Sequence, residues 1–483
     1  MARGIGEIVA KLASVVFFIA IARELGEESF GDFIFALSLT TLLLLAAGFG
    51  TEELVAREVA RERSRLDDYL SNVIVVKVAT SVALLAGAAA FVNLAGYSYD
   101  ARVAVYLVGA GVGLENLGRT WGSVFQAYER MDLLSISLIA QRTVTAGAGI
   151  AVLAAGGGLI AVSLVFLGGS LLGFVLAAYI LRRYVARPRL ALNRRRWGPI
   201  IRAGAPIGLV TLVLTVLVKL DQVLISFISD GGNRDVGAYG AAFRLVEATM
   251  FISWSFTAAF LPWAARRSED EWEQIGEGYE LGLKALTAIL LPIGVTFAVL
   301  AEPIVNLLYG EQYDSAVGAL RWLGVMTLFY GLNLLDAILL VARDRPLAFA
   351  RICAVVVALN VGLNLALIPP LAATGAALAA AVSSVVLAAL GGWRIATLTG
   401  RLSVVRPFAG PVLAGAAMTG AMLATSLPLV PTAVVGIVVY ALVLAVLERR
   451  LHPQDLELLR GVLRNRGGPP PPREPAVSVM EVS

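Results

Sequence analysis

The chain has 483 residues, of which 58% are hydrophobic and 15% are charged, and its mean hydropathy is +0.80. A soluble domain is typically about half apolar and about a quarter charged. This composition excludes soluble, fibrous and disordered classes and indicates a polytopic membrane protein. With a single cysteine, Cys353, and a single histidine, His452, we expect no metal site and no Ser-His-Asp triad. The net charge of +4 rests mainly on arginine.

Fourteen apolar segments are each long enough to cross the hydrocarbon core, which takes about 20 helical residues. In chain order they are 5–22, 33–50, 70–94, 101–125, 133–154, 159–181, 203–228, 237–262, 280–301, 317–341, 348–368, 371–393, 405–427 and 431–447. The first segment is interpreted as a helix and not as a signal peptide, because no small-residue cleavage site follows it.

Basic residues set the expected orientation, because cytoplasmic loops carry an excess of Lys and Arg. With the N-terminus inside, the inner segments hold 27 basic residues, whereas the outer loops hold only Arg23, Arg102 and Arg234. We therefore expect a multi-pass plasma-membrane protein with both termini in the cytoplasm.

The spans and loops predict five parts of the chain. These are an N-lobe of six helices (1–182), a basic cytoplasmic linker (183–202), a C-lobe of six helices (203–400), two further helices (401–447) and a cytoplasmic tail (448–483). The tail is expected to begin as a basic helix on the membrane surface and to end as a disordered Pro-rich segment.

An internal repeat relates the two sets of six helices. The pattern Gly-x-aromatic-x-x-Ala begins at Gly31 and again at Gly237, near the start of the second helix of each set. Chance recurrence in a Gly- and Ala-rich chain is the alternative, but the equivalent positions favour duplication. We expect an all-α polytopic membrane protein of about 14 transmembrane helices. Its two six-helix lobes would be related by a pseudo-two-fold axis around a central cavity, with two C-terminal helices outside them.

Apart from Arg102 and Arg406, which are the second residues of their spans, nine basic residues lie within the predicted spans, where a charge at the bilayer centre costs roughly 3 kcal/mol. Such residues must pair, reach the membrane surface or line a wet cavity. Lys284, Arg321 and Arg351 lie near helix ends and are expected to extend to the surface. The other six are candidates for a cationic substrate-binding cavity: Arg142, Lys219, Arg244, Lys11, Lys77 and Arg119.

Three acidic residues of the same spans are candidates for ion coupling or charge pairing: Asp221, Glu247 and Glu115. Glu115 lies four residues before Arg119, so an intrahelical ion pair is the alternative to a cavity role. Glu247 lies three residues after Arg244, and the same alternative holds there.

Lys219 and Asp221 are two residues apart, which is about 200° around a helix. At least one of them must therefore find a partner on another helix. The surplus of basic residues suits an anionic cargo, because the planar guanidinium matches phosphate oxygens and stays charged.

Six phrases of the chain occur in the same order as in a known family. They are ARELGEESFGDF (22–33), QAYERMD (126–132), VLVKLDQVLIS (216–226), VGAYGAAFRLVE (236–247), EPIVNLLYGEQYDSAVGALRWL (302–323) and NVGLNLALIPPLAATGAALAAAVS (360–383). Over residues 5–445 the chain resembles the Wzx-type polysaccharide and O-antigen flippases of the multidrug/oligosaccharidyl-lipid/polysaccharide exporter superfamily. Two departures are Ala372, where the family usually has Gly, and the fourteen helices, where many members have twelve.

The resemblance implies a flippase, not an enzyme, that turns a polyprenyl-pyrophosphate-linked oligosaccharide from the inner to the outer leaflet by alternating access. The cationic cavity would hold the pyrophosphate. No cofactor is implied beyond coupling to H⁺ or Na⁺, and the chain has no G-x-x-x-x-G-K-[ST] phosphate loop. The implied partners are the lipid-linked glycan, membrane lipids, and the glycosyltransferases and polymerase of the same pathway. No nucleic-acid partner is expected.

Three alternatives stay open. A peptidoglycan lipid-precursor flippase differs in cargo, and such flippases also have fourteen helices. A drug or cation antiporter of the same superfamily is disfavoured, because its cavity is expected to be acidic. A membrane glycan polymerase or ligase is disfavoured because the longest outer loop, 302–316, has only three acidic residues.

Overall fold

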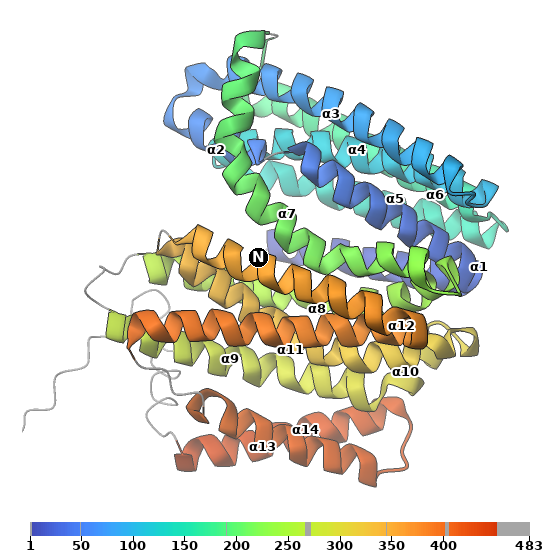
Figure 1. The fold of residues 1–483 in the computed structure, drawn as a ribbon, viewed down its shortest axis with the longest axis vertical. Coiled ribbons are helices and arrows are strands. Elements are labelled where there is room, and N and C mark those ends of the chain that lie inside the picture. Colours follow the sequence, from blue (N-terminus) through green and yellow to red (C-terminus); the bar gives the residue numbers. More distant parts are fainter. Residues whose placement is uncertain are drawn as a thin grey trace, which may run out of the picture.

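The computed structural model describes residues 2–48, 50–189, 191–265, 272–343, 345–400 and 405–451, and helices make up most of this part of the chain (Figure 1). We call the helices up to residue 180 the N-lobe: α1 (Ala2–Gly48), α2 (Thr51–Arg61), α3 (Leu66–Leu94), α4 (Tyr99–Ala127), α5 (Met131–Ala154) and α6 (Leu159–Ile180). We call the next six the C-lobe: α7 (Trp197–Ile228), α8 (Asn233–Ala265), α9 (Trp272–Val299), α10 (Ala301–Leu308), α11 (Asp314–Ala342) and α12 (Pro346–Thr399). The last two helices are α13 (Val405–Ala424) and α14 (Leu429–Leu451).

Helices α1 and α12 each contain two of the predicted helices, joined at a residue with non-helical backbone angles. In α1 this residue is Gly26, with φ 76° and ψ 175°. In α12 it is Ala372, with φ 48° and ψ −128°. Positive φ favours glycine, which has no β-carbon. Ala372 therefore makes a turn at a position where the resembling family usually has Gly.

Two short helices, α2 and α10, lie in segments that the sequence predicts as loops. Helix α2 buries Leu54, Val55 and Val59 on one face, whereas Arg57 and Arg61 are exposed. An amphipathic stretch of this length is too short and too charged to span a membrane, but it can fold against a larger bundle.

The prediction of an all-helical polytopic protein is confirmed. Within the described residues, ten helical stretches are long and apolar enough to cross a membrane, and two of them contain the kinks of α1 and α12. Because α4 and α7 are not among these ten, the count of fourteen crossings stays a prediction. The predicted tail falls outside the described residues beyond the end of α14.

The lobes meet along α1 and α8, and α7 connects them (Figure 1). The first turns of α7 pack against α2 and the turn before it, where a β-carbon at Gly50 would lie 2.4 Å from the carbonyl oxygen of Gly204. The rest of α7 packs against α12 and α1. Helix α7 is thus held by both lobes.

Helices α13 and α14 form a hairpin against α9. Lys284 on α9 forms an ion pair with Glu448 on α14. Helix α14 thus brings a carboxylate to this lysine, which no spacing within one helix could indicate. The expected extension of Lys284 to the membrane surface stays a prediction.

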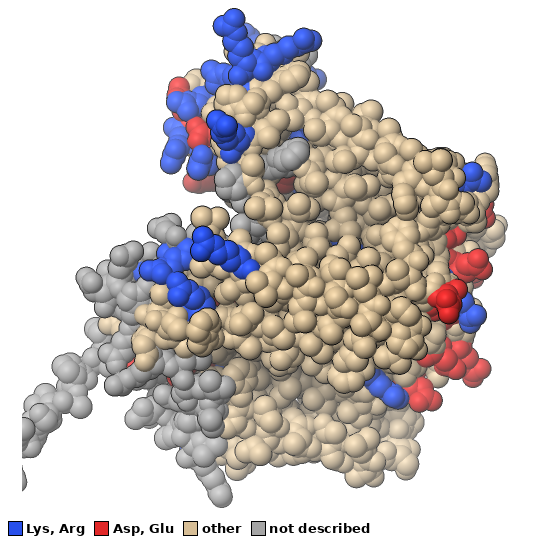
Figure 2. Space-filling model, viewed as in Figure 1, with Lys and Arg blue, Asp and Glu red and all other residues tan. Residues whose placement is uncertain are grey.

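Charges separate between the two ends of the molecule (Figure 2). Lys and Arg gather at one end, which we call the basic end and where the segment between α6 and α7 lies (Figures 1 and 2). Asp and Glu gather at the opposite end, which we call the acidic end. Helix α10 lies at the acidic end (Figure 1).

Candidate functional site

At the acidic end the two lobes touch backbone to backbone, and the contact is reciprocal. A β-carbon at Gly31 on α1 would lie 1.7 Å from the carbonyl oxygen of Asn233 on α8. A β-carbon at Gly237 would lie 2.0 Å from the carbonyl oxygen of Glu27. Glu27 and Asn233 each precede one of the two repeat glycines by four residues. The repeated motif therefore has a physical role, because only glycine permits so close an approach.

Polar side chains reinforce this contact. Arg234 forms an ion pair with Glu27 at 2.6 Å, and Ser315 on α11 also donates a hydrogen bond to Glu27. Asn233 donates a hydrogen bond of 2.5 Å to Asp32. The lobes are thus closed against each other at the acidic end.

Farther along the same lobe boundary, three charged residues from α7 and α8 form a cluster. Arg244 is 2.5 Å from Glu247, and Lys219 is 3.4 Å from the same carboxylate. The Arg244 guanidinium lies 3.7 Å from the ring centre of Phe18 on α1, and the Lys219 ammonium lies 4.9 Å from that of Phe243. Two cations share one carboxylate, so the cluster carries a surplus positive charge. We call Lys219, Arg244 and Glu247 the cation cluster.

The cation cluster has unused binding capacity. The side chains of Lys219 and Arg244 are 12% and 13% exposed. Within the described residues, the Nη2 atom of Arg244 is buried and has no hydrogen-bond partner. A buried donor without an acceptor is unfavourable, so this arrangement favours an incoming anionic oxygen. Because ring faces next to the cations attract positive charge, they hold the two side chains in position.

Asp221 lies apart from the cation cluster. Its carboxylate accepts hydrogen bonds from Tyr239 on α8 at 3.0 Å and from Asn364 on α12 at 2.7 Å. Asp221 forms no ion pair within the described residues. The side-chain amide of Asn364 also donates a hydrogen bond of 3.0 Å to the side-chain oxygen of Asn360. As the spacing predicts, Lys219 and Asp221 point to different neighbours.

Lys77, on α3, is fully buried and all of its hydrogen-bonding capacity is used. Its ammonium group is 2.7 Å from Glu52 on α2, 2.8 Å from the carbonyl oxygen of Asn116 and 3.2 Å from the hydroxyl of Thr120. An ammonium group has three protons to donate. Lys77 therefore joins α2, α3 and α4, and it leaves no donor for a ligand.

Glu115, Arg119 and Arg142 form a third arrangement within the N-lobe. Glu115 accepts hydrogen bonds from Gln141 at 2.7 Å and Ser170 at 3.2 Å, and it forms no ion pair with Arg119 within the described residues. Both arginines are exposed and interact electrostatically with Glu115. The alternative of an intrahelical pair is therefore not observed, and Glu115 is instead bonded to α5 and α6. The side chain of Lys11 lies outside the described residues.

Sequence reasoning missed the residues that fix the charged groups. Tyr239 and Asn364 hold Asp221, and Glu52 holds Lys77. The Asn360 and Asn364 pair was visible as two amides four residues apart on one helix. The bond from Asn364 to Asp221 on α7 was not visible, because contacts between helices depend on packing.

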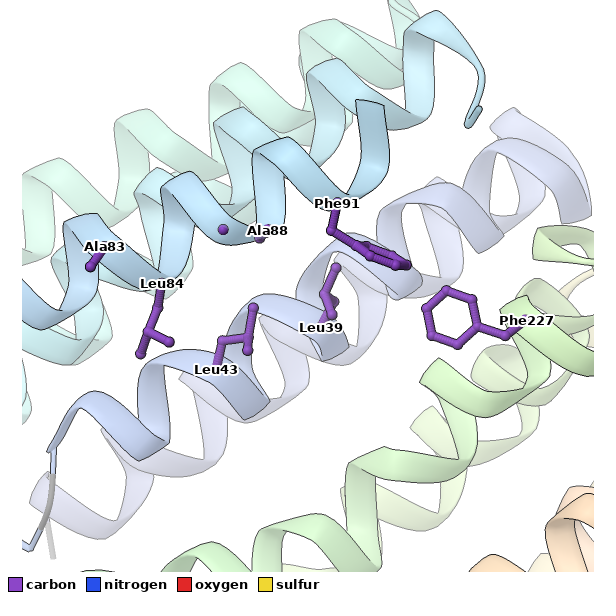
Figure 3. A pocket seen from close by; sticks show the side chains of 8 residues that line it. Leu39, Leu43, Ala83, Leu84, Ala88, Phe91 and Phe227 are labelled. Carbon is purple, nitrogen blue, oxygen red and sulfur yellow. The ribbon is translucent and has the colours of Figure 1, made fainter. Parts of the chain in front are cut away.

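An apolar pocket of about 340 Å³ opens at the lobe boundary, between α1, α3 and α7 (Figure 3). It is lined by Leu39, Leu43, Ala83, Leu84, Gly87, Ala88, Phe91 and Phe227. Because the lining is almost wholly hydrocarbon, the pocket suits an alkyl chain and not a charged or sugar group.

The two-lobed helical fold of this chain is similar to that of solved transporters. The similarity to solved transporters supports this class of fold. One is titled lipid II flippase MurJ in an inward closed conformation, with a TM-score of 0.78, 14% identity, and coverage of 93% of this chain and 99% of the other. Another is an inward-facing multidrug resistance MATE family transporter, with a TM-score of 0.67, 16% identity, and coverage of 82% and 96%.

The chain belongs to the polysaccharide biosynthesis protein family, whose model matches residues 3–268. The MatE family model matches residues 206–366. A curated relative is the probable low-salt glycan biosynthesis flippase Agl15 of Haloferax volcanii, which is 22% identical over 368 residues, 75% of each chain. The resemblance to polysaccharide flippases is thereby confirmed.

Proposed function

We propose that the protein is a flippase, not an enzyme, and that it carries a polyprenyl-pyrophosphate-linked oligosaccharide from the inner to the outer leaflet. The observation that carries the proposal is the cation cluster: two cations share Glu247 between the lobes, and one donor of Arg244 has no partner within the described residues. The family membership and the name of the Haloferax volcanii relative support this class of cargo.

The chemistry of the cargo fits the two environments at the lobe boundary. A pyrophosphate offers several anionic oxygens, and guanidinium and ammonium groups bind such oxygens strongly when water is excluded. The apolar pocket between α1, α3 and α7 suits part of the polyprenyl chain (Figure 3). We infer that the charged head group passes between the lobes and that the lipid tail stays in the bilayer.

We infer that the motion is alternating access. In a bilayer with the basic end in the cytoplasm, as the positive-inside rule requires, the closed acidic end faces outward (Figure 2). We infer that the structure is an inward-facing state. The TM-score to an inward-facing MATE transporter is 0.67, against 0.57 to an outward-facing one, which supports this inference. The lobes would then part at Gly31 and Gly237 to release cargo.

We propose Asp221 as the ion-coupling residue, which takes up H⁺ or Na⁺ during the cycle. Its carboxylate lies among neutral donors and has no cationic partner within the described residues. Glu247 instead holds the cation cluster together. The proposed location is the plasma membrane with both termini cytoplasmic, and the proposed partners are the glycosyltransferases and polymerase of the same pathway.

A peptidoglycan lipid-precursor flippase is the second candidate, and the TM-score of 0.78 to MurJ favours it. The two candidates share the lipid-pyrophosphate and differ in the sugars. A drug or cation antiporter is disfavoured because the surplus charge of the cation cluster would repel a cationic cargo.

The test is a flipping assay with the purified protein in liposomes. Fluorescent undecaprenyl-pyrophosphate-linked oligosaccharide is placed in one leaflet, and its arrival in the other is measured by accessibility to a quencher. Lipid II and an organic cation serve as competing cargoes. Transfer of the oligosaccharide lipid supports the main proposal, and transfer of lipid II alone supports the second candidate. Transport of the cation alone would contradict both.

A further inference from the structure

Beyond the cation cluster, the face of α8 that meets α1 continues toward the basic end. Gly237, Gly240 and Arg244 all meet α1 on this face, through Glu27, Ile34 and Phe18 respectively. Their spacing of three and four residues defines a single stripe of the helix. The same spacing continues through Glu247 and Phe251 to Trp254.

Trp254 is unusual among the residues of this stripe, because 56% of its surface is exposed. The exposed ring lies about 15 Å along α8 from Arg244, given the helical rise per residue. Its indole Nε1 donates a hydrogen bond of 3.1 Å to the hydroxyl of Tyr330 on α11.

The indole of Trp254 thus presents an apolar face with the hydroxyl of Tyr330 at its edge. The bond to Tyr330 fixes the orientation of the indole, so that its face stays available. Tyrosine hydroxyls accept and donate at once, and Tyr330 therefore retains a proton for a ligand oxygen. An apolar face with a hydroxyl at its edge matches a sugar ring, which presents C–H groups on one side and hydroxyls around its rim. An alkyl chain would leave that hydroxyl without a partner.

We propose that Trp254 and Tyr330 form a sugar subsite, on which a pyranose ring of the cargo stacks while its pyrophosphate binds at the cation cluster. This inference rests on the proposed flippase function and adds a source of glycan recognition to it. Trp254 contacts the face of the sugar, and Tyr330 both holds the indole and donates its hydroxyl proton to a sugar oxygen.

The test measures binding of two probes to the purified full chain in nanodiscs. One probe is undecaprenyl pyrophosphate, and the other is the same lipid carrying an N-acetylglucosamine disaccharide. We expect the wild type to bind the glycosylated probe about tenfold more tightly. Trp254→Ala is expected to abolish this preference without changing the affinity for the bare lipid, whereas Trp254→Phe retains part of it. Tyr330→Phe is expected to reduce the preference severalfold.

Trp393→Ala is the matched control, because Trp393 is also exposed, on α12, but lies outside the stripe of α8. It should leave the preference unchanged. A wild-type preference that survives in Trp254→Ala, or a wild type that binds the bare lipid through Arg244 but shows no preference, overturns the subsite alone. A wild type that binds neither probe overturns the proposed function with it.

Discussion

Two buried cation sites, one in each lobe, have opposite arrangements. Lys77 in the N-lobe has three partners for three protons and no exposed surface. Lys219 and Arg244 at the lobe boundary share one carboxylate, stay partly exposed and leave a donor unused within the described residues. The comparison indicates that the role of a charged residue within a membrane span depends on how many of its hydrogen-bond donors already have partners. A saturated cation stabilises the fold, whereas an unsaturated one between moving parts can bind a ligand.

The largest expected effect is a loss of stability when Lys77, whose three donors all have partners, is replaced. Lys77→Met should destabilise the protein by about 4 kcal/mol, because it leaves Glu52 and a buried carbonyl without their cation. Thermal unfolding of the purified variant measures this change. Arg61→Met is the control, because Arg61 is 70% exposed and its pair with Glu58 is worth little. Equal unfolding temperatures for Lys77→Met and wild type would show that the site is not structural.

The contact between the lobes at the acidic end provides the next test. Gly31→Ala places a β-carbon against the carbonyl of Asn233 and should favour a state open at that end. In a Cys353→Ala background, an Ile34→Cys reporter, buried in wild type, should then react severalfold faster with a thiol reagent added from outside. Gly168→Ala is the control, because a β-carbon there meets no atom within 4 Å. Unchanged labelling would contradict a glycine-dependent closure.

Substitutions of Lys219, in the cation cluster, and of Arg142, in the N-lobe, should lower the flipping rate by different amounts. Lys219→Ala should lower flipping about tenfold, since it removes one of two cations that face an anionic cargo. Arg142→Ala should lower it about twofold, because Arg142 is exposed in the N-lobe and apart from the cation cluster. Initial rates in the liposome assay measure both. A larger loss for Arg142→Ala than for Lys219→Ala would move the binding site into the N-lobe.

The smallest expected effect concerns the kink of α12. Ala372→Gly should stabilise the protein by about 1 kcal/mol, because glycine tolerates the positive φ at this position. Ala373→Gly, one residue later in helical geometry, should instead destabilise it by about 1 kcal/mol. Thermal unfolding of the Ala372→Gly and Ala373→Gly variants measures both changes. If both substitutions lower the unfolding temperature, the backbone at Ala372 is not strained.

Helix positions could be predicted from the sequence because hydrophobic length is a local property. The segment predicted at 101–125 is observed as α4, Tyr99–Ala127, and the repeat at Gly31 and Gly237 marked the contact between the lobes. Helix α2 was not predicted, because its burial depends on the bundle that it packs against.

The charged residues themselves could also be identified, but their partners could not. The i, i+3 spacing indicated the Arg244–Glu247 pair, which is observed. The similar spacing of Glu115 and Arg119 indicated a pair that is absent from the described residues. Local spacing cannot decide between such cases, because helices distant in sequence supply the competing donors.

The most direct test of the central claim is the flipping rate of Arg244→Ala relative to wild type, with undecaprenyl-pyrophosphate-linked oligosaccharide as cargo. Arg321→Ala serves as the matched control, since Arg321 is an exposed span residue on α11. If the cation cluster binds the pyrophosphate, flipping by folded Arg244→Ala protein falls at least about tenfold, and flipping by Arg321→Ala is unaffected. Full flipping by a folded Arg244→Ala protein would contradict the account.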